Sequence, residues 1–286
     1  MPIKTILVPL NGTDSDAPAL ATALMAAGRF DAHVEALHAR PNPKDMVGYM
    51  TGTITAGPES LRQSVLEAAL SSADEQAKKV RAFLEEQCAA NNVPMVEEPP
   101  GAGGASVAWI EDMGRESDVV VRHSRFADLL VLPRPIDHAQ KAATLEISLM
   151  DNRRRILVAP PVAPKSLGDK IAVAWNGSAE AARAVTAAMQ FLAGSNAVTV
   201  LTTEKRAETV GALTRYLTWH GIAAETRLFK TGSLSAGEAI LAATEHMGAD
   251  LLVMGGYGHS RMQERILGGV TQHALAHAEI PLFMAH

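Results

Sequence analysis

The sequence predicts an α/β protein made of two copies of one doubly wound unit, each with a parallel sheet covered by helices. The first observation is an internal repeat: residues 3–13 read IKTILVPLNGT and residues 168–178 read GDKIAVAWNGS. The second is the pentapeptide Ala-Asp-Leu-Leu-Val, which occurs at 127–131 and at 249–253. The third is that the strand-like runs are apolar throughout and alternate with helical stretches, which is typical of strands buried on both faces.

The composition favours a globular protein and excludes several classes. Apolar residues make up 47% and charged residues 20% of 286 residues, so the chain can build a core. A net charge of −5 argues against a nucleic-acid binder that neutralises phosphates. No apolar run approaches the roughly 20 residues of a membrane helix, and the N-terminus has no cleavage-site pattern. With one cysteine, neither a disulfide framework nor a thiolate metal cluster is expected, and the cytoplasm is the expected location.

The two copies are separated by a proline-rich connector. Residues 160–168 read PPVAPKSLG, which neither a helix nor a strand would tolerate. We therefore expect one domain at 1–163 and a second at 164–286.

In the second unit, helices fill the intervals between short apolar strands. Its expected strands are 170–175, 197–202, 225–230, 250–254 and 282–285. Its expected helices are 179–193, 206–220, 235–247 and 269–278.

The first unit begins with the repeated strand, a helix from residue 16 to 28, and one long amphipathic helix in which apolar residues recur every three or four positions from Leu61 to Cys88. Cys88 is then a small buried residue. Asp118–Arg122 reads locally as a strand because it is rich in valine. In the repeat, however, it corresponds to a helix, so we expect a helix at 117–126 preceded by a strand at 107–112. Residues 156–159 would form the last strand.

The stretch 251–271 carries the most chemical information. It reads LLVMGGYGHSRMQERILGGVT, a buried strand followed by two glycine clusters, the second of which opens a helix. Glycines allow the backbone to approach a ligand, and a helix N-terminus offers unpaired N–H groups to an anion. The alternative is a pair of tight turns beside a surface helix. One glycine cluster directly follows the strand and the other directly precedes the helix, and this arrangement favours an anion site.

The spacing Gly255-x2-Gly258-x9-Gly268, together with the two strand-opening repeats, resembles the universal stress protein family over essentially the whole chain. That family has Ser or Thr after the last glycine, where this chain has Gly269. The resemblance implies five-stranded parallel sheets in the order 3-2-1-4-5. It also implies binding of ATP or another adenine nucleotide, with or without Mg²⁺, and no chemistry common to all members.

The rule for ligand sites in open α/β sheets and the resemblance to the family predict the same position for the site. Ligands of open α/β sheets lie beyond the carboxyl ends of the strands where the strand order reverses, here between the first and fourth strands of the second unit. Asn176 stands where the family usually has Asp, and it could also cap a helix together with Ser178. Losing the hydroxyl at position 269 should weaken phosphate binding without abolishing it, because Thr271 could partly substitute. The expected nucleotide-binding residues are Asn176, Gly177, Val200, Thr202, Met254, Gly255, Gly258, His259, Gly268, Gly269, Val270 and Thr271.

The leading functional hypothesis is a cytoplasmic nucleotide-binding regulatory module, with the site in the C-terminal half and no catalytic residues. The alternatives are a slow ATPase that uses the same pocket, and a nucleotide-free scaffold for protein interactions. Catalysis would need a base or a metal-binding carboxylate, and the loop supplies only Glu264. His273 and His277 have a spacing compatible with a metal but lack an obvious third ligand, so no metal site is expected.

Two further expectations concern symmetry. The last strands of the two units are sheet edges, so the units should pair as an internal pseudo-dimer, and a homodimer remains open. The nucleotide site should be single, because Pro133-Arg134 of the first unit correspond to Gly255-Gly256, and residues 115–167 contain no glycine.

Overall fold

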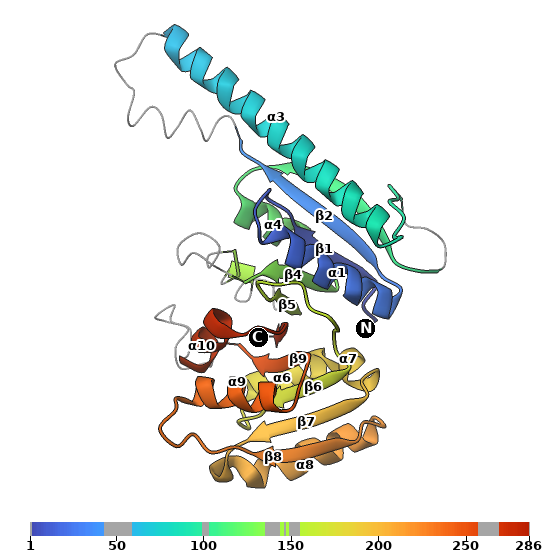
Figure 1. Cartoon of the computed structure of the whole chain (residues 1–286), viewed down its shortest axis with the longest axis vertical. Helices are drawn as coiled ribbons and strands as arrows, with labels where there is room; N and C mark the ends of the chain where they lie inside the picture. Colours follow the sequence, from blue (N-terminus) through green and yellow to red (C-terminus); the bar gives the residue numbers. More distant parts are fainter. Residues whose placement is uncertain are drawn as a thin grey trace.

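The computed structural model describes residues 2–42, 59–98, 103–134, 144–145, 147–148, 155–256 and 269–285. Its strands form one ten-stranded sheet in the order β3-β2-β1-β4-β5-β10-β9-β6-β7-β8, which runs through the middle of the molecule (Figure 1). The strands are β1 Thr5–Pro9, β2 His33–Arg40, β3 Ser106–Met113, β4 Leu129–Pro133, β5 Ile156–Ala159, β6 Lys170–Ala174, β7 Ala197–Thr202, β8 Ala224–Leu228, β9 Leu251–Gly255 and β10 Leu282–Ala285.

The sheet consists of two halves with the same strand order. We call β1–β5 with their helices the N-terminal unit and β6–β10 with theirs the C-terminal unit. Counted within each unit, the order is 3-2-1-4-5, and every pair inside a unit is parallel. The doubly wound α/β fold is therefore confirmed. The two five-stranded sheets are continuous, because β5 and β10 pair antiparallel with Leu157 opposite Phe283.

Helices cover both faces of the sheet. One buried cluster joins α1, α3, α6, α7 and α8 to one face, and a second joins α4, α9 and α10 to the other. The helices are α1 Asp16–Phe30, α3 Glu59–Ala90, α4 Glu116–Ser124, α6 Ala179–Ala187, α7 Met189–Ala193, α8 Ala207–Trp219, α9 Ala236–His246 and α10 Gly269–His277, and a 3-10 turn, η1 Glu204–Arg206, precedes α8.

The valine-rich segment predicted as a helix from the repeat is indeed α4. Val119 and Val120 are fully buried on it, so tertiary packing overrides their local preference for a strand. One helix expected at 179–193 is instead two. The N–H of Ala188 is shared between the carbonyls of Ala184 and Val185, which tightens the chain between α6 and α7.

The two units also touch beside the connector. The Arg29 guanidinium donates to the carbonyl of Leu167 at 3.1 Å, to the carbonyl of Gly168 at 2.8 Å and to the Asp169 carboxylate at 3.1 Å. Phe191 of the C-terminal unit lies edge-on against Phe30, with ring centroids 4.7 Å apart. The connection between the units is thus held against α1. A domain boundary between residues 163 and 164 stays a prediction.

The single cysteine gives a direct test of this packing. Cys88 is 2% exposed on α3, and burial raises the pKa of its thiol. Because the thiolate is the reactive form, we expect Cys88 to react slowly with a disulfide reagent in the native protein at neutral pH. In guanidinium chloride, where the protein is unfolded, one equivalent of thiol per chain should react rapidly with the same reagent. Fast labelling without denaturant would contradict this packing of α3.

Candidate functional site

A cleft of about 420 Å³ opens at the carboxyl ends of β6 and β9. These strands are neighbours in the sheet although β7 and β8 lie between them in sequence, so the cleft marks the point where the strand order reverses. Its wall comes from the β6–α6 turn, the ends of β7 and β9, the residues after β8, and the first turns of α9 and α10. The lining residues are Ala174, Trp175, Asn176, Ser178, Glu180, Ala181, Leu201, Thr203, Arg206, Phe229, Ala236, Ile240, Met254, Gly255, Gly256, Gly269, Val270 and Thr271.

The β6–α6 turn is built by the repeated Asn-Gly pair. Gly177 has a φ of +75°, and its counterpart Gly12 has +74°, so both units use glycine for the same left-handed turn. The side-chain oxygen of Asn176 accepts the N–H of Ser178 at 3.0 Å, and the Ser178 hydroxyl accepts the N–H of Ala181 at 3.2 Å. Asn176 therefore supports the helix cap and also lines the cleft.

Gly255 is required to be a glycine for a second reason besides the one expected. A Cβ atom there would lie 2.7 Å from the backbone nitrogen of Ala181 and 2.7 Å from the carbonyl carbon of Glu180. The end of β9 thus lies directly against the first turn of α6. The absent side chain makes room for this helix as well as leaving the strand end open to the cleft.

The first turn of α10 forms the facing wall. Gly269, Val270 and Thr271 line the cleft, and Thr271 is 7% exposed. No φ in the left-handed range is found for Gly269, and no described atom lies within 4 Å of the place its Cβ would take. The first N–H groups of a helix lack partners within the helix, so this turn can present donors and a positive dipole end to the cleft.

Twelve of the eighteen lining residues were not predicted, and three of these stand out by their side chains: Trp175, Arg206 and Phe229. The indole of Trp175 donates to the Thr209 hydroxyl at 2.9 Å, which holds the ring in place. Arg206 is an exposed residue at the end of η1 and brings a positive charge to the wall. Each of these residues follows a strand by a few positions, and that sequence signal could have identified them.

The structure brings six of the twelve predicted residues to the cleft: Asn176, Met254, Gly255, Gly269, Val270 and Thr271. Gly177 shapes the turn, and neither Val200 nor Thr202 lines the cleft. Because side chains alternate along a strand, Leu201 reaches the cleft while Val200 packs into the opposite face. The Thr202 hydroxyl donates to the carbonyl of Trp175 at 2.9 Å. Gly258, His259 and Gly268 lie outside the described residues, as does Glu264.

The described residues of the N-terminal unit leave almost no space at the equivalent position. The cavity at the ends of β1 and β4 measures about 10 Å³, too little for more than one water molecule. Leu132 and Pro133 line it from β4, and Thr144 lies at the far wall. The described residues of the two units therefore differ strongly in open volume at the two equivalent places.

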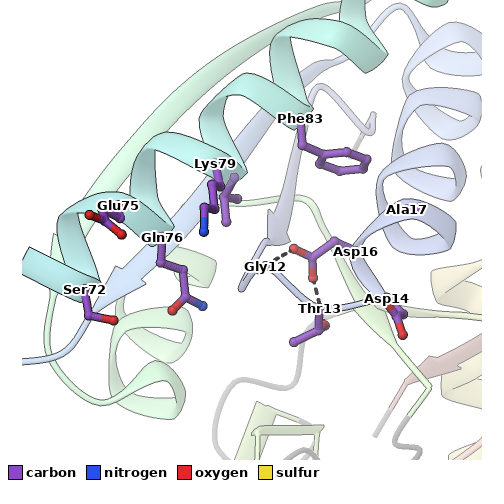
Figure 2. Close-up of a pocket in the computed structure, with 11 residues that line it drawn as sticks. Gly12, Thr13, Asp14, Asp16, Ala17, Ser72, Glu75, Gln76, Lys79 and Phe83 are labelled. Carbon is purple, nitrogen blue, oxygen red and sulfur yellow. Dashed lines mark hydrogen bonds between the residues drawn. The ribbon is translucent and has the colours of Figure 1, made fainter. Parts of the chain in front are cut away.

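A larger hollow of about 670 Å³ lies in the N-terminal unit between the β1–α1 turn and the side of α3 that faces this turn. Figure 2 shows Asp16 and Thr13 on one side and Lys79, Gln76 and Phe83 on the other. The Asp16 carboxylate accepts the N–H of Gly12 at 2.7 Å and the N–H of Asn11 at 2.9 Å. Burial raises the pKa of Asp16 despite these bonds. The Asp16 carboxylate thus stabilises the turn between β1 and α1.

His273 and His277 stack with ring centroids 4.2 Å apart. No group of three or more His, Cys, Asp or Glu side chains within the described residues is arranged to hold a metal ion. In the same part of the chain, no helix has the length and apolar character needed to cross a bilayer.

The fold and the cleft define a doubly wound α/β protein with ligand-sized space where its strand order reverses. Residues 205–286, which include β8, β9, β10 and the cleft residues from Arg206 onward, match the model of the universal stress protein family. Over this part the chain is similar to the universal stress protein family, in agreement with the resemblance noted in the sequence.

Solved structures extend the likeness of fold to the whole chain. A universal stress protein from Archaeoglobus fulgidus is 15% identical with a TM-score of 0.69, over 98% of this chain and 97% of that one. A functionally unknown protein from Pseudomonas aeruginosa is 14% identical with a TM-score of 0.57, over 99% and 92%. A universal stress protein in complex with cAMP aligns at 15% identity with 57% of this chain and 100% of its own, with a TM-score of 0.32. No curated protein matches the sequence.

Proposed function

We propose that this protein is a cytoplasmic regulatory module that binds one adenine nucleotide in the cleft of its C-terminal unit. The observation that carries the proposal is the cleft itself, about 420 Å³ at the reversal of strand order, which is within the usual range for small-molecule sites. The family of residues 205–286 and the glycine spacing 255-258-268 favour a nucleotide over other ligands.

The walls of the cleft divide into two kinds. Leu201, Phe229 and Ile240 supply apolar surface suited to the faces of a purine ring. Arg206 and the first turn of α10 supply positive charge and backbone donors suited to phosphate oxygens. Asn176 lies on the turn between β6 and α6 and offers an amide for a hydroxyl or a ring nitrogen.

Native mass spectrometry of freshly purified protein tests the proposal. We expect a mass increase that matches an adenine nucleotide, and denaturation followed by chromatography should release the same compound. The spectrum should also show whether magnesium accompanies the nucleotide. Protein that stays ligand-free and shows no binding when ATP, ADP and AMP are titrated separately would exclude the proposal in favour of a scaffold.

Restoring the missing hydroxyl should strengthen binding. Gly269→Ser places a side chain where no described atom lies within 4 Å, at the start of α10. A hydrogen bond to a charged acceptor is worth about 1.5–3 kcal/mol, so the affinity for ATP should rise by about tenfold or more. Calorimetric titration measures the change. Gly269→Ala is the matched control, because it adds the Cβ without the hydroxyl, and its affinity should stay close to that of the parent protein.

A further inference from the structure

Within the part of the chain that the structure describes, the edge of the sheet at β8 is open along its whole length. β8 pairs with β7 on one side, and no described residue forms a hydrogen bond to its other side. Figure 1 shows it as the last strand at the lower end of the sheet. At the opposite end, the N–H of Val96 donates to the carbonyl of Val107 in β3 at 2.8 Å, so residues 94–96 partly cover that edge. The two ends of the sheet are therefore not equivalent.

The hydrogen bonds to β7 determine which residues of β8 face outward. The N–H of Phe229 donates to the carbonyl of Thr202 at 2.9 Å, so the backbone groups of Phe229 point toward β7. Backbone direction alternates along a strand, so Glu225 and Arg227 also point inward. The backbone N–H and C=O groups of residues 224, 226 and 228 are then directed away from the sheet and available to another strand.

The side chains of β8 are complementary to a second copy of the same strand. In an antiparallel pair centred on Thr226, the outward backbone groups of the two copies meet. Glu225 then lies opposite Arg227 of the second copy, and the two-fold symmetry produces this pair twice. These are non-hydrogen-bonded positions, where opposite side chains come closest, about 4.5 Å between Cα atoms.

The same charges disfavour the neighbouring alignments. Backbone pairing requires outward residues to face outward residues, so the strand can shift only in steps that centre the pair on residue 225 or on residue 227. The first places Glu225 opposite itself, and the second places Arg227 opposite itself. Like charges directly opposite each other are destabilising. Only the alignment centred on Thr226 pairs opposite charges, and neither charge has an ion-pair partner among the described residues.

Exposed apolar side chains flank this strand. Trp219 is 85% exposed at the end of α8, and Leu228 is 49% exposed at the end of β8. The antiparallel pair centred on Thr226 brings Leu228 of one copy opposite Ala224 of the other, five residues after Trp219. Leu228 is then covered in part by the second copy. Charged side chains on an exposed edge strand commonly prevent association with other strands. In β8, however, the charges repel a second copy in the two neighbouring alignments and attract it in the alignment centred on Thr226. This charge pattern therefore favours one specific pairing.

We propose that β8 is a homodimer interface, in which two chains pair antiparallel about Thr226 and extend their sheets into one. The proposal is independent of nucleotide binding. A cross-strand charge pair is worth about 0.2–1 kcal/mol, and each reversal replaces two attractive pairs by two repulsive ones. Arg227→Glu or Glu225→Arg should therefore raise the dimer dissociation constant by about tenfold or more.

Sedimentation velocity of the full chain over a concentration series tests this. We expect a monomer–dimer equilibrium that each single reversal weakens and that the double variant Glu225→Arg/Arg227→Glu restores, because the exchanged charges remain complementary. Thr226→Pro should abolish the dimer while leaving the circular dichroism spectrum unchanged, since the N–H it removes points away from β7. Lys78→Glu, an exposed position on α3 with the same charge change as Arg227→Glu, is the control. A monomer at every concentration, or a dimer indifferent to Thr226→Pro, or a double variant no tighter than the single ones, would overturn the proposal.

Discussion

Titration of the full chain with ATP is expected to saturate at close to one nucleotide per chain. The C-terminal cleft offers about 420 Å³, whereas the equivalent place in the N-terminal unit offers about 10 Å³. Pro133 stands there in place of a glycine, and it has no N–H to donate to a phosphate. Side chains would have to leave that space before a nucleotide could enter. Isothermal calorimetry measures the stoichiometry directly.

Charge variants locate the site. Arg206→Glu reverses the charge of the one arginine or lysine among the described cleft residues, so the affinity for ATP should fall by about tenfold or more. Lys205→Glu makes the same charge change at a neighbouring exposed residue that does not line the cleft, and its effect should be clearly smaller. Pro133→Val should leave binding unchanged. A stoichiometry of two, or equal losses in the Arg206 and Lys205 variants, would contradict a single site in this cleft.

Gly255→Ala is expected to destabilise the protein by about 2–3 kcal/mol, a large effect for one added methyl group. The added Cβ would lie 2.7 Å from the backbone of both Glu180 and Ala181, and backbone at the start of a helix cannot rotate away as a side chain could. The strand and the helix must therefore separate. In thermal unfolding we expect the Tm to fall by roughly 4–10 °C.

Gly269→Ala is the matched control for this prediction as well. It adds the same methyl group at a glycine whose Cβ would meet no described atom within 4 Å. Its Tm should stay within about 2 °C of the parent protein, since surface changes away from packed sites are usually worth less than 0.5 kcal/mol. Equal stability of the two variants would show that β9 does not lie against α6 as described.

The fold could be predicted from the sequence because its signals are repeated. Two Asn-Gly turns, two Ala-Asp-Leu-Leu-Val strands and an alternation of apolar and helical segments are local patterns, and each appears twice in the same order. The repeat even corrected a misleading local preference, since Asp118–Arg122 is rich in β-branched residues yet lies in α4. The position of the cleft followed as well, because parallel strands place their carboxyl ends on one edge of the sheet.

Individual wall residues were harder to predict. Val200 and Thr202 were expected beside the ligand, but the pleat of β7 turns Leu201 to the cleft. A shift of one residue in register reverses the face of every side chain, and strands that are apolar on both faces give no alternation by which to choose. Arg206 and Phe229 come from segments after two other strands, and their distance from β9 is a property of the assembled sheet.

The sequence by itself predicted two doubly wound units, their strand order through the family resemblance, and the place in the second unit where a cleft lies. Those features depend on hydrophobic periodicity and on the places of glycine and proline, which act within a few residues along the chain. Only the tertiary structure decided the antiparallel register in which β5 and β10 join the two sheets, that Gly255 lies against α6, and that among the described residues β8 is left as an open edge. These depend on distances between segments far apart in sequence, and such distances are set by packing and by backbone pairing between strands.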